Sequence, residues 1–117
     1  MINIKIKRVY EPPSNDDGFK VLVERLWPQG ISKLDNNIDL WEKEIAPSPE
    51  LLLDFETGTV LWPEFEQKYI EELRYNKTLD ILIKTLRSKE KVTLLHDNKD
   101  YNHNPALVLM KILEQKL

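Results

Sequence analysis

Apolar and polar residues alternate at the start of the chain, and this alternation predicts a β-strand. Between residues 1 and 10, isoleucines occupy every second position and polar residues separate them: Ile2, Ile4 and Ile6. A period of two residues is typical of a strand with one buried face. Further along, the short apolar run Val21-Leu22-Val23 predicts a second strand that is covered on both faces.

Residues 11–18 between these two strands are expected to form a loop. Pro12-Pro13 cannot take part in a strand ladder, and Asp17-Gly18 is typical of a turn. No helix fits into this connection, although parallel neighbours need a longer crossover. We therefore expect the first two strands either to form an antiparallel pair or not to be neighbours.

Helical spacing dominates the middle of the chain, after a polar segment from Gly30 through Asn37. Ile38, Trp41 and Ile45 recur at helical spacing and predict a short amphipathic helix that ends at Ala46-Pro47.

Ser48 is the predicted N-cap of the next helix, which has Pro49 at its first position. Leu51, Leu52 and Phe55 supply the apolar side of this helix, and Gly58 ends it.

The longest predicted helix begins at Trp62-Pro63. Its apolar stripe is expected to pack on the core and consists of Trp62, Phe65, Tyr69 and Leu73. Asn76 breaks this helix, and Thr78 is the expected cap of a continuation through Leu86.

The last third of the chain predicts one more strand and one more helix. Residues 91–95 form the strand, and residues 96–103 are polar throughout. Asn104-Pro105 then provides an N-cap and a first helical residue, and the almost wholly apolar residues 106–113 predict a heavily buried helix.

This order of elements predicts an α/β fold in a single domain over residues 1–117. We expect a small layered fold with a short mixed sheet and about four to five flanking helices. The chain between Arg25 and Lys91 is long enough for a right-handed crossover, so the two strands at its ends can lie parallel. Residues 25–27 and residues 96–97 would then emerge at the same edge of the sheet.

The net charge, the lack of cysteine and the lack of a long apolar run argue against several classes of protein function. The 117 residues carry a net charge of −3, which argues against a dedicated nucleic-acid-binding protein. The chain contains no cysteine, which excludes disulfides, a thiolate zinc site and a cysteine nucleophile. No apolar run approaches the roughly 18 residues that span a bilayer, and the first residues do not resemble a signal peptide. We therefore expect a cytoplasmic protein without a membrane partner.

The predicted strand ends suggest a ligand site, because open α/β sheets bind ligands at the carboxyl ends of their strands. Arg25 there offers a planar fork for a carboxylate or phosphate, and Trp27 offers a stacking face. The helix start at Asn104 exposes backbone N–H groups that suit an anion, and Lys99 adds positive charge. The candidate ligand-binding residues are Arg8, Arg25, Trp27, His96, Lys99 and Asn104.

Each candidate also has a purely structural interpretation. Arg25 could pair with Glu24, Asp97 or another carboxylate and so fix the end of the strand. Trp27 could pack in the core or a loop, and Asn104 could serve only as an N-cap. Both interpretations stay open at this point.

His96, Asp97, Asp100 and His103 are residue types that bind zinc or iron. They lie in one loop, where spacing fixes no geometry, so we assign no metal and no cofactor. His96 with Asp97 would also suit acid–base chemistry. Glycine-rich phosphate loops and a serine nucleophile elbow are absent, and we assign no catalytic residue.

Blocks of sequence across nearly the whole chain point to one family. They are Lys7-Arg8-Val9-Tyr10, Leu22-Val23-Glu24-Arg25-Leu26-Trp27-Pro28, Trp41-Glu42-Lys43-Glu44-Ile45-Ala46-Pro47-Ser48, Phe65 with Tyr69 and Glu72-Leu73, Thr93-Leu94-Leu95, and Asn104 with Ala106-Leu107-Val108-Leu109. These blocks resemble the DUF488 family, in its short YeaO-like branch. The resemblance implies a compact, bacterial or archaeal α/β domain with a distantly rhodanese-like layout. The function of that family is undefined, so the resemblance implies no reaction.

The chain departs from the pattern of this family at two places. Gln29 stands where the family usually has an arginine, and His96, Asp97 and Asn98 stand where a tyrosine and small residues are common. A family site that uses both arginines would therefore hold less positive charge here.

Two function classes follow from the sequence. The first is binding, with or without turnover, of a small anionic or nucleotide-like ligand at the carboxyl ends of the strands. The second is a non-catalytic interaction or regulatory module that contacts protein or nucleic acid. A local basic strip would serve the second class, and its members are Lys5, Lys7, Arg8, Lys20 and Arg25.

Overall fold

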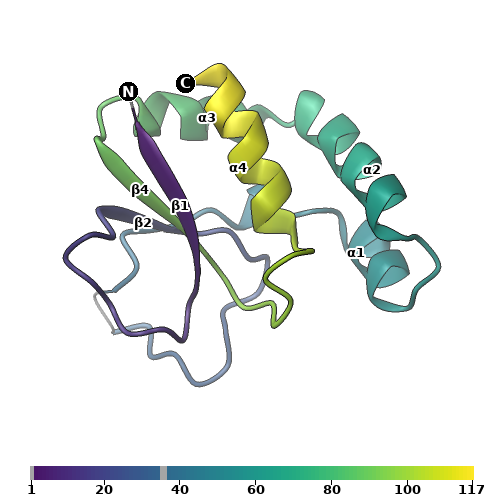
Figure 1. Cartoon of the computed structure of the whole chain (residues 1–117), viewed down its shortest axis with the longest axis horizontal. Coiled ribbons are helices and arrows are strands. Elements are labelled where there is room, and N and C mark those ends of the chain that lie inside the picture. The colour runs from purple at the N-terminus through teal and green to yellow at the C-terminus, as the bar shows by residue number, and fades with distance from the viewer. Residues whose placement is uncertain (1, 35–36) are drawn as a thin grey trace.

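In the computed structural model, which describes residues 2–34 and 37–117, four parallel strands form one sheet in the order β1-β4-β2-β3. Figure 1 shows β1, β4 and β2 of this sheet. The strands are β1 (Asn3–Arg8), β2 (Phe19–Leu22), β3 (Leu40–Trp41) and β4 (Lys91–His96). The predicted α/β class is confirmed, but each described strand pairing is parallel, where we expected a mixed sheet. Met1 of the predicted first strand and residues 35–36 of the predicted polar segment lie outside the described residues.

β4 lies between β1 and β2, so the first two strands are not neighbours. Leu94 of β4 is in register with Ile6 of β1 on one side and with Val21 of β2 on the other. This confirms the second of the two arrangements that the short first connection allowed. The predicted parallel pairing of the strands on either side of the long crossover is also confirmed, because β2 and β4 are parallel neighbours.

The helices lie together on one side of the sheet, and loops cover the other (Figure 1). They are the 3₁₀ turn η1 (Lys43–Ile45) and the helices α1 (Pro49–Glu56), α2 (Trp62–Arg74), α3 (Lys77–Leu86) and α4 (Pro105–Lys116). The core between helices and sheet is apolar, and its largest fully buried members include Phe65, Tyr69, Leu94 and Leu109. The predicted stripe on α2 packs here, and α4 is buried along most of its apolar run, as predicted.

Side-chain caps begin three of these helices. Ser48 accepts a hydrogen bond from the Leu51 N–H, and Asn104 accepts one from the Leu107 N–H, which confirms both predicted N-caps. The cap of α3 is Asn76, whose side-chain oxygen accepts from the Thr78 N–H. The prediction of Thr78 as the cap was therefore wrong, because the asparagine two residues earlier supplies the acceptor.

The predicted amphipathic helix over residues 38–45 is wrong. Leu40–Trp41 forms β3, which extends the free edge of β2, and only residues 43–45 turn as a 3₁₀ helix. The Asp39 N–H donates to the Lys20 carbonyl and the Glu42 N–H donates to the Leu22 carbonyl, each at 2.9 Å. Pairing with the free edge of β2 is therefore preferred here to forming a helix. The helical spacing was supported by only three apolar residues.

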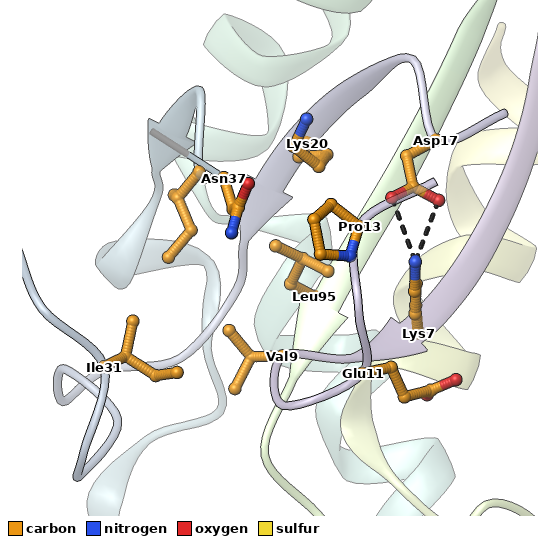
Figure 2. Close-up of a pocket in the computed structure, with 10 residues that line it drawn as sticks. Lys7, Val9, Glu11, Pro13, Asp17, Lys20, Ile31, Asn37 and Leu95 are labelled. Atoms are coloured by element: carbon orange, nitrogen blue, oxygen red, sulfur yellow. Dashed lines mark hydrogen bonds and ion pairs between the residues drawn. The ribbon is translucent and has the colours of Figure 1, made fainter. Parts of the chain in front are cut away.

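The sheet face away from the helices is closed by the loop over residues 9–18 and the segment around residue 38. Figure 2 shows Asp17 above this face, with both carboxylate oxygens directed to the Lys7 ammonium group. The Thr93 hydroxyl of β4 donates to the Asp17 carbonyl at 2.6 Å, so the loop is fixed across the middle of the sheet. The space left beneath it is about 20 Å³, room for about one water molecule.

Within residues 2–34 and 37–117, no helix combines the length and the apolar character needed to cross a membrane.

Candidate functional site

A cleft of about 600 Å³ opens at the carboxyl ends of β2 and β4. Its lining comes from residues 23–26 after β2, residues 46, 47, 49, 52, 53 and 56 before and along α1, residues 97 and 98 after β4, and Pro105 of α4. Leu52 and Leu53 of α1 line this space together with Glu24 and Asp97. The prediction that the ends of these two strands meet at one edge is therefore confirmed, and a cleft lies there.

Two carboxyl groups lie together on the strand side of the cleft. The Asp97 N–H donates to the Glu24 carboxyl at 3.3 Å, which joins the end of β4 to the end of β2. Burial, and next the nearby Asp97 carboxylate, raise the pKa of Glu24 to about 7. Glu56 of α1 adds further negative charge on the facing wall. This cleft therefore combines apolar walls with a cluster of acidic groups, one of which titrates near neutrality.

Arg25 lines the cleft, but its guanidinium group is engaged elsewhere. Its terminal nitrogen Nη2 donates to the carbonyl groups of Ala46 and Pro47 at 3.2 and 3.1 Å, and Nη1 lies 3.8 Å from the Glu44 carboxylate. Of the structural partners expected for Arg25, the structure gives another carboxylate, Glu44, rather than Glu24 or Asp97. Arg25 therefore fixes the wall of the cleft through two main-chain carbonyl groups.

The same wall, residues 44–48, is held from behind by α2 and the start of α3. The buried Tyr69 hydroxyl donates to the Ile45 carbonyl at 2.7 Å, and the Asn76 amide donates to the Glu44 carbonyl at 2.9 Å. Glu72 accepts hydrogen bonds from the backbone N–H and the hydroxyl of Ser48. The wall is thus fixed at several successive residues, although most of it lacks regular secondary structure.

Of the six residues predicted to bind a ligand, Arg25 is the one that lines the cleft. Arg8 donates to the Asp97 carbonyl at 3.3 and 3.4 Å and lies over the Tyr10 ring, so it supports the loop behind the cleft. Asn104 caps α4 and is buried, next to Pro105, which does line the cleft.

The other three predicted residues lie apart from the cleft lining. His96 is fully buried, with its Nδ1 accepting from the Asn98 N–H at 3.1 Å. Trp27 packs edge to face against Trp41, with ring centroids 5.2 Å apart, and its indole N–H donates to the Ile31 carbonyl. Lys99 is exposed in the loop before α4.

Residues that we did not assign to the site make most of the cleft. From the sequence, we considered Glu24 as a partner of Arg25, Asp97 as such a partner and as a metal-binding or acid–base residue, and Leu52 as part of the apolar side of a helix. We did not single out Leu53. One signal was available: a charge follows directly on the apolar run of residues 21–23, where the strand ends. No signal in the sequence shows that Leu52 and Leu53 of α1 line a cleft with that strand end.

The predicted basic strip is largely neutralised. Lys5 and Lys7 both pair with Asp17, at 3.0 and 2.9 Å, and Lys20 lies 3.9 Å from Asp39. These lysines are therefore engaged in ion pairs within the protein.

Across the described residues, no group of three histidine, aspartate or glutamate side chains is arranged to hold a metal ion. In the loop before α4, Asp100 accepts from the Asn102 and His103 N–H groups and its carboxylate lies 3.3 Å from the His103 ring nitrogen. These side chains order the loop, and a zinc site has no support in the part of the chain that the structure describes.

Comparison with known proteins decides the family. Residues 3–117 match the family model described as "Inactive DUF488-N3 subclade". The chain belongs to the DUF488 family. This confirms the resemblance seen in the sequence blocks, and the matched residues include each strand and helix that the structure describes in this DUF488 domain.

Relatives of this DUF488 chain occur in bacteria. The uncharacterized protein YeaO of Escherichia coli is 41% identical over 108 residues, which cover 92% of this chain and 94% of YeaO. The uncharacterized proteins Mb3100c of Mycobacterium bovis and Rv3073c of Mycobacterium tuberculosis are each 36% identical over 110 residues, covering 94% of this chain and 92% of theirs. No solved structure gives a significant match.

Proposed function

We propose that this DUF488 chain is a binding module that holds a small molecule, without turnover, in the cleft at the carboxyl ends of β2 and β4. The observation that carries this proposal is the cleft of about 600 Å³, whose lining combines the leucines Leu52 and Leu53 with the acidic residues Glu24 and Asp97. Small-molecule sites typically enclose roughly 300–1,000 Å³ and combine apolar walls with a few polar groups. Their usual place in open α/β sheets is this same edge.

Binding is favoured over turnover by the family description, which calls this subclade inactive. A specific observation favours acid–base catalysis as a second candidate, since the pKa of Glu24 at about 7 would suit a general acid. Turnover would also need a group that attacks or activates the substrate. Among the side chains that line the cleft, the Asp97 and Glu56 carboxylates are the groups able to do this, because Arg25 is held by main-chain carbonyl groups.

The ligand class expected from the sequence was anionic or nucleotide-like. The apolar wall of Leu52 and Leu53 supports the ring of a nucleotide-like ligand. The acidic groups Glu24, Glu56 and Asp97 repel a negative charge placed against them. An anionic group on the ligand would therefore have to point out of the cleft to solvent.

A fragment screen by NMR on two matched variants tests the proposal. Leu53→Trp places a large ring in the cleft, and Ile81→Trp makes the same kind of change on α3; both side chains are 60% exposed, so both variants should fold. We expect cleft-binding fragments to shift the amide resonances of residues 24–26, 52–53 and 97–98 in the wild type and in Ile81→Trp. Leu53→Trp should lose these shifts.

Two outcomes would contradict the binding proposal. In one, no fragment of a diverse set perturbs the cleft residues of the wild-type chain. In the other, fragments perturb them equally in wild type and Leu53→Trp, which would place the bound molecule elsewhere.

A further inference from the structure

The Glu24 carboxyl group has no cationic partner among the described residues. It accepts a hydrogen bond from the Asp97 N–H, and in its protonated form it also hydrogen-bonds the Asp97 carboxylate; Asp97 and Glu56, which both raise its pKa, are themselves acidic. A carboxylate that is shielded from water costs folding free energy unless a positive or hydrogen-bond-donating group compensates it. The cleft therefore contains a half-buried carboxyl group whose charged form has no cationic partner among the described residues.

Arg25 is adjacent in sequence but cannot supply that partner without releasing the wall. The guanidinium group is planar, so the bonds from Nη2 to the Ala46 and Pro47 carbonyl groups fix the direction of its other nitrogens. Its Nη1 atom faces Glu44 at 3.8 Å, and its Nε atom is buried without a hydrogen-bond partner in the described part of the chain. No cation of the described chain is therefore free to pair with the Glu24 carboxylate, and a molecule bound in the cleft can supply that donor.

The arrangement around Glu24 indicates the shape of that donor. A carboxylate accepts two parallel N–H groups from one planar partner. Leu52 and Leu53 cover the facing wall, and Pro49 lies at the start of the same helix, so an attached ring would find an apolar surface. A planar group with two N–H donors would hydrogen-bond to Glu24, and an apolar ring attached to it would contact Leu52 and Leu53.

We propose that the cleft recognises a planar group with two parallel N–H donors, the Glu24 carboxylate accepting both and the leucines of α1 covering the attached ring. This inference rests on the proposed binding function and specifies its ligand class. Amidinium and guanidinium compounds carry such an edge, and so does guanine, through its ring N–H and amino group. The donor pair is the chemistry that these compounds share.

Affinity for such a ligand depends on pH through Glu24. The proton and the donor pair compete for the same carboxylate, and Asp97, Glu56 and Arg25 are the other charged groups that line this part of the cleft. Because the pKa of Glu24 is about 7, binding should weaken as the pH falls from 8 to 6.

Titration of the full chain with four probes tests the inference: benzamidine, guanosine, benzoate and benzyl alcohol, each followed by NMR and calorimetry at pH 8. We expect benzamidine or guanosine to shift the cleft resonances, whereas benzoate should not bind. The benzamidine and guanosine arms distinguish a cationic amidine from a neutral base as the source of the donor pair.

Glu24→Gln is the decisive variant, because glutamine keeps the size of the side chain and can still accept the Asp97 N–H. It should weaken binding of the donor-pair probe at least about tenfold, as expected for loss of a charged acceptor. Glu90→Gln, an exposed change just before β4 at the opposite edge of the sheet, is the matched control and should have no effect. If Glu24→Gln folds poorly, the fall in wild-type affinity between pH 8 and pH 6 gives the same test.

The inference is overturned if neither donor-pair probe binds the cleft, or if Glu24→Gln binds them as tightly as the wild type. Benzoate or benzyl alcohol binding in the cleft while the donor-pair probes do not would overturn this ligand class and leave the binding function standing. Absence of any cleft binding in the fragment screen would remove both.

Discussion

The Glu72 carboxylate of α2 accepts two hydrogen bonds from Ser48, one from its backbone N–H at 2.8 Å and one from its hydroxyl at 2.6 Å. The same hydroxyl caps α1 by accepting from the Leu51 N–H. One acidic side chain of α2 thus holds the cap of the preceding helix, α1, and with it the end of the cleft wall. The position of α1, and therefore of the leucines that face Glu24, depends on this contact.

Replacing Glu72 by alanine should destabilise the fold by about 2–3 kcal/mol, because the change leaves the Ser48 N–H without its partner in a half-buried place. Urea denaturation gives the free energy of unfolding directly. Glu71→Ala is a suitable control: Glu71 is exposed and makes only an ion pair with Arg74 one turn along the helix, which should cost less than about 0.5 kcal/mol. Equal losses in the two variants would show that Glu72 does not fix α1.

Gly18 lies directly before β2, at a position where a side chain does not fit. It has a positive φ of 65°, and a Cβ atom there would lie 2.3 Å from the Lys91 carbonyl oxygen. We expect Gly18→Ala to cost more than about 3 kcal/mol, because it combines backbone strain with a clash against main-chain atoms. Gly58→Ala separates the two effects: its φ is 78° but no atom lies within 4 Å, so it should cost only about 1 kcal/mol. Thermal unfolding of both variants measures the difference, and similar losses would mean that the clash is relieved.

Some parts of this fold could be predicted from the sequence alone. Ser48 and Asn104 were recognisable as caps because each precedes a proline at a helix start, and capping is decided within three residues. The parallel pairing of β2 and β4 was also accessible, because the long helical stretch between them leaves few alternatives. Local chemistry and chain length were sufficient for these elements.

The strand β3 and the lining of the cleft could not be predicted, because they depend on contacts between residues far apart in the chain. Leu40–Trp41 became a strand because β2 had a free edge, and the Trp41 indole N–H found the Glu24 carbonyl at 2.6 Å. The lining of the cleft could not be predicted for the same reason. The sequence suggested that the Arg25 guanidinium group binds a ligand, but in the structure it donates to the carbonyl groups of Ala46 and Pro47. Sequence located the edge of the sheet where the cleft lies, whereas tertiary contacts decided which charges remain available there.

Asp17 should make stability depend on acid pH. It is 1% exposed; burial alone would raise its pKa, but the Ser14 N–H and the ammonium groups of Lys7 and Lys5 outweigh this and lower the pKa to about 2. The unfolded chain titrates near 3.8, so this stabilisation is complete above that pH and disappears as the pH falls toward 2. It amounts to about 2 kcal/mol.

Asp17→Asn tests this directly, because it keeps the shape of the side chain and removes its charge. We expect a loss of about 2–3 kcal/mol at pH 7, measured by urea denaturation, and no difference from the wild type near pH 2. Asp16→Asn is the control: that carboxylate also faces Lys5 but is 71% exposed, so its loss should cost less than about 0.5 kcal/mol. A gap between wild type and Asp17→Asn that persists unchanged to pH 2 would contradict the assignment.

Glu24 should act in the opposite direction, because the fold disfavours its charged form. Its pKa rises from 4.5 in the unfolded chain to about 7 in the folded one, through burial first and the Asp97 carboxylate next. A carboxyl group with a raised pKa supports the fold fully below pH 4.5, and this support is lost as the pH rises through 7. At pH 8 the wild-type chain therefore carries a cost of about 3 kcal/mol that Glu24→Gln removes.

The variant should thus be more stable than the wild type at pH 8 and indistinguishable from it at pH 4, with Glu90→Gln unchanged at both. Denaturation at the two pH values measures this, and a Glu24→Gln variant that is less stable at pH 8 would mean that the carboxylate is compensated within the fold. The result bears on function as well. A variant that gains stability while losing a donor-pair ligand would show that Glu24 costs the fold free energy which binding recovers.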